Sequence, residues 1–149
     1  MPLIEAGFIN NDGAPDSQKL ITFGPTIEVI IGHIASDSGT PEQAQSVLAL
    51  VDTGAFDCCI DSRIAESLSL PVVDVCEISG SGGTKTHPVY MAHIYIPLLE
   101  RSQYGRFAGV DLIDGGQPHG ALLGRTFLKN VIMIYDGLRA QVTVASAKV

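Results

Sequence analysis

The chain has 149 residues, 46% of them hydrophobic, which is enough for one domain to bury a core without disulfide or metal cross-links. Only 17% of the residues are charged and the net charge is -7, so no basic field favours nucleic acid or an anionic membrane, and we expect neither as a partner. The 16 glycines and 8 prolines between short runs of isoleucine, valine and leucine favour a mainly β protein.

Turn-forming residues interrupt the apolar residues at the start of the chain. They are Asn-Asn-Asp-Gly at 10–13 and Ala-Pro-Asp-Ser at 14–17. We expect residues 1–23 to form an N-terminal arm or an edge hairpin, in front of a main domain over residues 24–149. The sequence has no basic-then-apolar leader and no run approaching the ~20 apolar residues that span a bilayer. We therefore expect a cytoplasmic protein, unless a leader or a larger precursor has been trimmed away.

Two strands and a short helix are predicted next. The β-branched residues at 25–35 and the apolar residues at 46–51 predict strands, separated by a polar loop. Asp61 or Ser62 can then cap a short helix that runs through Leu68, because apolar residues four apart share one helix face. A proline at position 71 prevents the helix from continuing.

The second half of the chain is predicted as a series of short elements. Strands at 72–78 and 88–96 flank a glycine-rich segment at 79–84, which we expect to be a mobile hairpin tip. The remaining elements are a strand at 107–113, a turn at 114–118, an apolar run at 121–124, a short helix at 125–130, a strand at 131–135, a tight turn at 136–137 and its partner strand at 139–145.

The most informative stretch is Leu-Ala-Leu-Val-Asp-Thr-Gly-Ala at 48–55, an apolar strand that delivers a carboxylate, a hydroxyl and a glycine into a turn. An ionisable residue at the end of such a strand is either functional or well hydrogen-bonded. By itself, the motif also fits a plain turn in which the Asp52 side chain bonds backbone amides.

A second motif, Ala-Leu-Leu-Gly-Arg-Thr-Phe-Leu at 121–128, follows about seventy residues later. Together with Leu-Val-Asp-Thr-Gly-Ala it resembles the retropepsin-like (retroviral-type) aspartic protease family, over roughly residues 24–145. The segments at 61–71 and 131–144 look more like the cellular and bacterial branch than the viral one. Residues 1–23 lie outside the resemblance.

The resemblance implies a single-lobe retropepsin-like acid protease barrel with a flap hairpin and one or two short helices. It also implies an aspartic endopeptidase that acts on a peptide or protein substrate, with Asp52 as its catalytic carboxylate. This chemistry needs two carboxylates that share one proton around a water, and the chain supplies one Asp-Thr-Gly. The second Asp52 is therefore expected from the symmetry mate in a homodimer, with no metal and no cofactor.

Further residues take their roles from the resemblance. Thr53 would bond across the dimer axis, Gly54 would allow close approach of the substrate backbone, and Ala55 would complete the active-site loop. The flap that closes over a bound peptide would consist of Ser79, Gly80, Ser81, Gly82, Gly83 and Thr84, although an ordinary flexible hairpin has the same composition. A structural second motif would consist of Leu122, Leu123, Gly124 and Arg125.

Arg125 departs from the family pattern. The family arginine pairs with an aspartate four positions after the catalytic one, and here that position is Phe56, followed by Asp57. Either Asp57 takes the pairing, or the dimer is tied differently, or Arg125 is a solvated residue at the start of a helix.

Several other patterns are set aside. The string Asp37-Ser38-Gly39 is too near Asp52 for a duplicated lobe and is expected to be a polar loop. The four histidines lack helical i, i+4 spacing and no Cys-x-x-Cys is present, so no metal site is expected. The odd number of cysteines, with two adjacent, is poor geometry for a disulfide framework. We expect Cys58, Cys59 and Cys76 to be reduced, and we favour packing over a redox role for the first two.

Two other functions stay open. A non-catalytic retropepsin-like dimeric module could bind peptides or proteins without cleaving them, although it could discard Asp52, Thr53 and Gly54 without cost to its fold. Alternatively, the domain could be cut from a longer polyprotein or membrane precursor.

Overall fold

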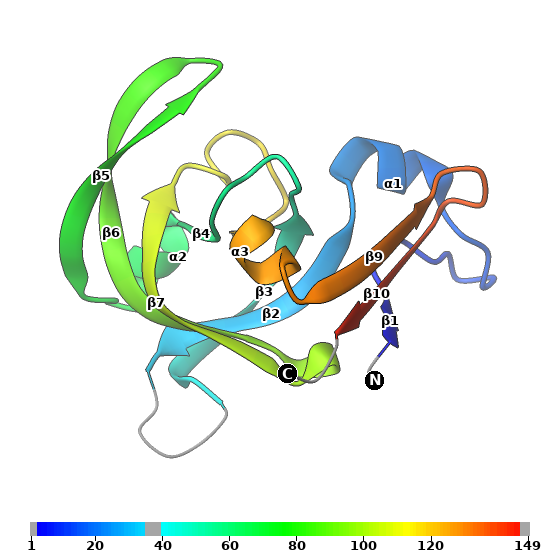
Figure 1. The fold of residues 1–149 in the computed structure, drawn as a ribbon, viewed down its shortest axis with the longest axis horizontal. Coiled ribbons are helices and arrows are strands. Elements are labelled where there is room, and N and C mark those ends of the chain that lie inside the picture. The colour runs from blue at the N-terminus through cyan, green and yellow to red at the C-terminus, as the bar shows by residue number, and fades with distance from the viewer. Residues whose placement is uncertain (1–2, 35–39, 147–149) are drawn as a thin grey trace.

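The computed structural model describes residues 3–34 and 40–146 (Figure 1). The fold is mainly β, with 53% strand and 14% helix, which confirms the class predicted from composition. The strands are Leu3–Glu5 (β1), Thr26–His33 (β2), Glu42–Val51 (β3), Cys59–Asp61 (β4), Val72–Gly80 (β5), Gly83–Ile96 (β6), Arg101–Val110 (β7), Ala121–Leu123 (β8), Val131–Asp136 (β9) and Gln141–Ser146 (β10). The helices are Ser17–Phe23 (α1), Ser62–Ser67 (α2), Arg125–Leu128 (α3) and the short 3-10 helix Pro97–Leu99 (η1).

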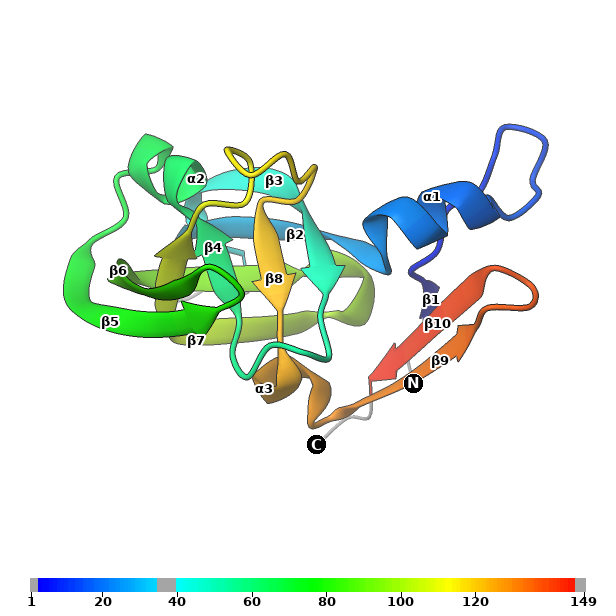
Figure 2. The ribbon, with the colours of Figure 1, turned by 90° about the horizontal axis from the view of Figure 1, so that it is seen from above.

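Six strands close into a barrel. Their order is β2-β3-β8-β4-β7-β6, and pairing of β6 with β2 completes the ring (Figure 2). Period-2 alternation fills the interior, since Ile27, Val29 and Ile31 of β2 are buried while Glu28 between them is exposed. β5 pairs only with β6 and extends the sheet beyond the barrel as one arm of a long hairpin.

Two pairs of barrel strands are parallel and join distant parts of the chain. β3 pairs with β8, and β4 pairs with β7. β4 also lies antiparallel to β8. The carboxyl ends of β3 and β8 consequently meet at one edge of the barrel, although about seventy residues separate them in sequence.

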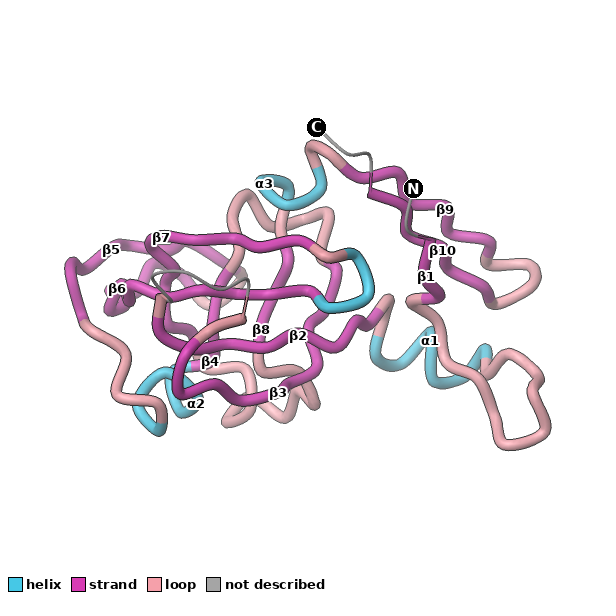
Figure 3. The backbone as a smooth tube through the Cα atoms, turned by 90° about the horizontal axis from the view of Figure 1, so that it is seen from below, coloured by secondary structure: helices cyan, strands magenta, loops and turns pink. Residues whose placement is uncertain are grey.

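A second, three-stranded sheet has the order β1-β10-β9 and lies beside the barrel (Figure 3). It joins the two ends of the described chain, because β1 pairs antiparallel with β10. Arg101 ties this sheet to the barrel, since its guanidinium donates to the hydroxyl of Ser146 at 3.3 Å and lies 5.4 Å from the ring centre of Phe127.

Several predicted elements need correction. The described residues form three α-helices and one 3-10 helix, more than the one or two expected. The sequence predicts an arm or an edge hairpin over residues 1–23, but this segment contains a helix, α1. It follows an isolated β-bridge between Ile9 and Pro15. The Asp16 side chain caps α1 by accepting from the amide of Lys19 at 3.0 Å, and Gly24 ends the helix at a φ of 74°.

Strand boundaries also differ from the predictions. β3 begins at Glu42, and β7 occupies 101–110 instead of 107–113, because its pairing with β6 stabilises the polar residues that precede Phe107. The turn before β10 spans residues 137–140 and not 136–137, since the Asp136 carboxylate accepts from the Arg139 amide at 3.0 Å. Asp37, Ser38 and Gly39 lie outside the described residues.

In the described part of the chain, no helix has both the length and the apolar character needed to cross a membrane.

Candidate active site

The Asp52 loop begins at the carboxyl end of β3. The strand buries Ala49 and Val51, and its register with β8 places Val51 opposite Leu123. The Asp52 amide then donates to the Leu123 carbonyl at 2.9 Å, which holds the start of the loop against β8. The half-buried Asp52 side chain accepts from the Gly54 amide at 2.9 Å.

The second motif supports this loop through the backbone. The Arg125 amide donates to the Ala55 carbonyl at 2.9 Å, and the Thr126 amide donates to the Phe56 carbonyl at 3.1 Å. Leu122 and Leu123 belong to β8 and pair with the last residues of β3. The two motifs identified in the sequence are thus hydrogen-bonded to each other through their backbones.

Gly124 allows this close docking. It lies between β8 and α3, and a Cβ atom there would collide with the Asp57 carbonyl group and lie 2.9 Å from the Ala55 carbonyl oxygen. Any larger residue would push the second motif away from the Asp52 loop. The need for glycine here comes from close backbone packing, because the φ of Gly124 is an ordinary -89°.

The Arg125 side chain bonds the Asp52 loop directly. Its guanidinium donates to the Thr53 carbonyl at 2.9 Å. The Asp57 carboxylate instead accepts from the Thr126 hydroxyl at 2.7 Å and from the Cys58 amide at 2.8 Å. Of the alternatives left open for Arg125, an ion pair with Asp57 of the same chain does not form. Sequence reasoning also missed Thr126, which the second motif already contained.

Among residues 3–34 and 40–146, Asp52 has no carboxylate partner. Across the described residues, its one side-chain hydrogen bond is with the Gly54 amide, and no aspartate or glutamate shares a hydrogen bond with it. Thr53 and Gly54 are exposed beside it, and Ala55 is half-buried. The loop therefore presents one carboxylate, backed by main-chain bonds, at an accessible edge of the barrel.

The cysteines near the loop are poor nucleophiles. All three are free, and Cys58 is buried. Burial raises the pKa of the Cys58 thiol. Burial, followed by the negative charges of Cys58, Asp57, Cys76 and Asp52, raises the pKa of Cys59 to about 12. A thiol whose pKa is raised stays protonated near neutral pH, so Cys58 and Cys59 suit packing better than redox or nucleophilic chemistry.

The predicted flap is the tip of the β5–β6 hairpin. Gly80 pairs with Gly83 across a two-residue turn formed by Ser81 and Gly82, and Gly83 has a φ of 94°. The hydroxyls of Ser79 and Thr84 lie 2.8 Å apart and link the two strands below the turn. All six residues are exposed. Figure 1 shows this tip on the same side of the barrel as the loop that follows β3.

Among residues 3–34 and 40–146, no group of three or more histidine, cysteine, aspartate or glutamate side chains is arranged to hold a metal ion.

No family model matches the chain, and no curated protein matches it. The resemblance to retropepsin-like proteases therefore rests on the two sequence motifs.

Proposed function

We propose that the chain is one subunit of an aspartic endopeptidase that cleaves peptide bonds. The observation that carries this proposal is the Asp52 loop, whose Asp-Thr-Gly is held by backbone bonds from Leu123, Arg125 and Thr126. These backbone bonds fix the position of the carboxylate without an ion pair to a basic side chain. The carboxylate can therefore take part in proton transfer.

The chemistry needs a second carboxylate, which we propose comes from Asp52 of a second copy. Two carboxylates held close share one proton, because like charges cannot both ionise cheaply. The ionised member would deprotonate a water that attacks the peptide carbonyl. The protonated member would polarise that carbonyl and then protonate the leaving amine. This reaction requires no metal or cofactor.

An exposed apolar sheet face, formed by Leu3, Ile132 and Ile134, supports the homodimer. Their exposed fractions are 67%, 56% and 61%. The register places Leu3 and Ile132 in one row with Ala145, and Ile134 follows two residues along the same face of β9. A second copy that covered this face would remove apolar area from water. The two chains would then meet along the sheet that their terminal strands β1, β9 and β10 form.

The proposal extends to the flap and to the location of the enzyme. The β5–β6 tip would close over an extended peptide and supply backbone hydrogen bonds to it. Free thiols beside the site fit the reducing conditions of the cytoplasm, where we propose the enzyme acts.

The test is incubation with a diverse peptide library, followed by mass spectrometry of the products. We expect cleavage by the wild type and none by Asp52→Asn, while Asp111→Asn, a change at an exposed aspartate outside the loop, should retain activity. Cleavage by Asp52→Asn at the wild-type rate would refute the mechanism. Saturable peptide binding without cleavage by the wild type would instead identify a non-catalytic binding module.

A further inference from the structure

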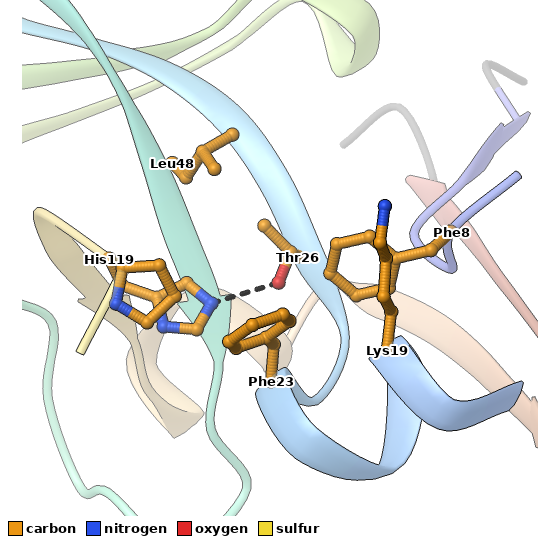
Figure 4. Close-up of a pocket in the computed structure, with 7 residues that line it drawn as sticks. Phe8, Lys19, Phe23, Thr26, Leu48 and His119 are labelled. Carbon is orange, nitrogen blue, oxygen red and sulfur yellow. Dashed lines mark hydrogen bonds between the residues drawn. The ribbon is translucent and has the colours of Figure 1, made fainter. Parts of the chain in front are cut away.

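A pocket of about 140 Å³ lies between the N-terminal segment and the barrel (Figure 4). One wall consists of Phe8 together with Lys19 and Phe23 of α1. The other comes from the start of β2, from Leu48 of β3 and from the loop before β8. Its lining residues belong neither to the Asp52 loop nor to the flap, and the N-terminal wall lies outside the family resemblance.

The walls of the pocket are mainly apolar. The rings of Phe8 and Phe23 have centroids 5.9 Å apart and planes tilted by 55°. Leu48, on the barrel side, leaves 43% of its surface exposed. The volume is close to that of an engineered apolar cavity of about 150 Å³ that binds benzene. The pocket can therefore hold one aromatic ring or a branched aliphatic group.

The polar residues at the base of the pocket lie within hydrogen-bonding distance of other polar groups of the protein. His119 is 1% exposed, and its Nε2 lies 2.9 Å from the hydroxyl oxygen of Thr26. The Thr26 hydroxyl also donates to the Gly24 carbonyl at 3.0 Å, and the other ring nitrogen of His119, Nδ1, lies 3.3 Å from the side-chain oxygen of Gln117. Burial lowers the pKa of His119, which keeps the ring neutral near pH 7. The base thus offers a ligand no positive charge.

Lys19 supplies the only cationic group among the residues that line the pocket. It projects from α1 alongside the Phe8 ring (Figure 4). The ion pairs found within the described residues involve three arginines, and Lys19 is in none of them. An ammonium group beside an apolar slot complements a ligand that carries a carboxylate next to an apolar group.

We propose that this pocket binds a small carboxylate with a single aromatic ring or a branched aliphatic group. The apolar group lies between the phenylalanine rings and Leu48, and the carboxylate pairs with Lys19. Both a free carboxylic acid and the C-terminal residue of a peptide offer this chemistry. The proposal is independent of the proposed protease activity.

The first experiment uses phenylacetate as the probe, with calorimetry for affinity and amide NMR shifts of the wild type for location. We expect saturable binding, with shifts centred on Phe8, Lys19, Phe23 and Leu48. Phenylacetamide, which lacks the charge, and acetate, which lacks the ring, should both bind more weakly. N-acetylphenylalanine and its amide form the peptide arm. Binding of the acid form but not the amide identifies a peptide C-terminus as an accepted source, and binding of phenylacetate alone identifies a free acid.

The second experiment uses variants of the two halves of the pocket. Lys19→Gln should weaken phenylacetate binding on the order of fivefold, the range of one exposed ion pair. Leu48→Trp should abolish binding by filling the slot, and Lys129→Gln, a matched change at an exposed lysine beside α3, should have no effect. Equal binding of phenylacetate and phenylacetamide, or wild-type shifts located elsewhere in the chain, would overturn the proposal even if a variant failed to fold.

Discussion

Asp61 joins two separate parts of the chain through a single buried carboxylate. Its side chain is 1% exposed. One oxygen caps α2 by accepting from the amides of Arg63 and Ile64 at 2.9 and 3.4 Å. The other accepts from the amides of Leu112 and Ile113, both at 2.9 Å. The carboxylate therefore connects α2, which follows the Asp52 loop and β4, to the loop after β7.

Removing this carboxylate should destabilise the fold strongly. We expect Asp61→Ala to lower the free energy of unfolding by about 2–4 kcal/mol, because it deletes a helix cap and removes the acceptor of four backbone amides, of which that of Ile64 is buried. Urea denaturation measures the effect. Asp111→Ala, at an exposed aspartate, should change stability by less than about 0.5 kcal/mol. Similar losses in the two variants would contradict the assigned role of Asp61.

Buried histidines should make stability depend on pH. Burial lowers the pKa values of His93 and His119. Nδ1 of His93 is also buried without a hydrogen-bond partner. Because the folded state disfavours the charged ring, their contribution is complete above the unfolded pKa of about 6.5 and is lost as the pH falls below it.

We therefore expect the free energy of unfolding to fall between pH 7 and pH 5, by at most about 1.4 kcal/mol per pH unit for each histidine. Urea titrations at several pH values measure this slope. His93→Phe should give a shallower slope than the wild type, because one of the two groups no longer titrates. An unchanged slope in this variant would show that His93 does not contribute.

At the scale of elements, the β5–β6 hairpin offers a direct test of the flap. Gly83 has a φ of 94°, a conformation that strains a β-branched residue. Gly83→Val should distort the tip and reduce peptide turnover severalfold, with little change in melting temperature because the tip is exposed. The matched change Gly13→Val, at an exposed glycine with a φ of 84° in the N-terminal segment, is the control and should leave turnover near that of the wild type. Unchanged turnover in Gly83→Val would mean that the tip is not a lid.

Local signals made some elements predictable and others not. The apolar runs that precede Asp52 and Gly124 predict the end of β3 and the strand β8 from the sequence alone. The sequence does not predict the seven-residue helix α1, because Asp16, the residue that caps it, lies in the string Ala-Pro-Asp-Ser, which is also typical of a turn. The contact of Arg125 with the Thr53 carbonyl was unpredictable, since it depends on how closely β8 approaches β3.

At the scale of the whole molecule, activity should require association of two chains. One Asp-Thr-Gly per chain and two carboxylates per site mean that specific activity should fall on dilution through the dimer dissociation constant. Excess Asp52→Asn subunits should also inhibit the wild type, because mixed dimers hold one competent carboxylate. Activity assays paired with sedimentation of the same samples provide the measurement. Constant specific activity from a monomer would contradict the homodimer.

The exposed apolar face of Leu3, Ile132 and Ile134 allows a second test of the homodimer. Ile134→Asp should weaken the dimer and lower activity at a fixed concentration, because it places a charge in the proposed interface. Ile21→Asp, on α1, changes a residue that is 73% exposed and serves as the matched control. If both variants sediment and cleave like the wild type, the dimer forms through another surface.

The parallel pairing of β3 with β8 has a consequence for the nascent chain during translation. Asp52 leaves the ribosome long before Leu123, Arg125 and Thr126, the residues whose backbone groups hold its loop. At roughly 5–20 residues per second, synthesis of the intervening segment takes several seconds. During that interval the loop has no support, so a partly synthesised or prematurely terminated polypeptide carries the aspartate without an assembled site. The strand order itself thus delays completion of the Asp52 loop until β8 and α3 have been synthesised.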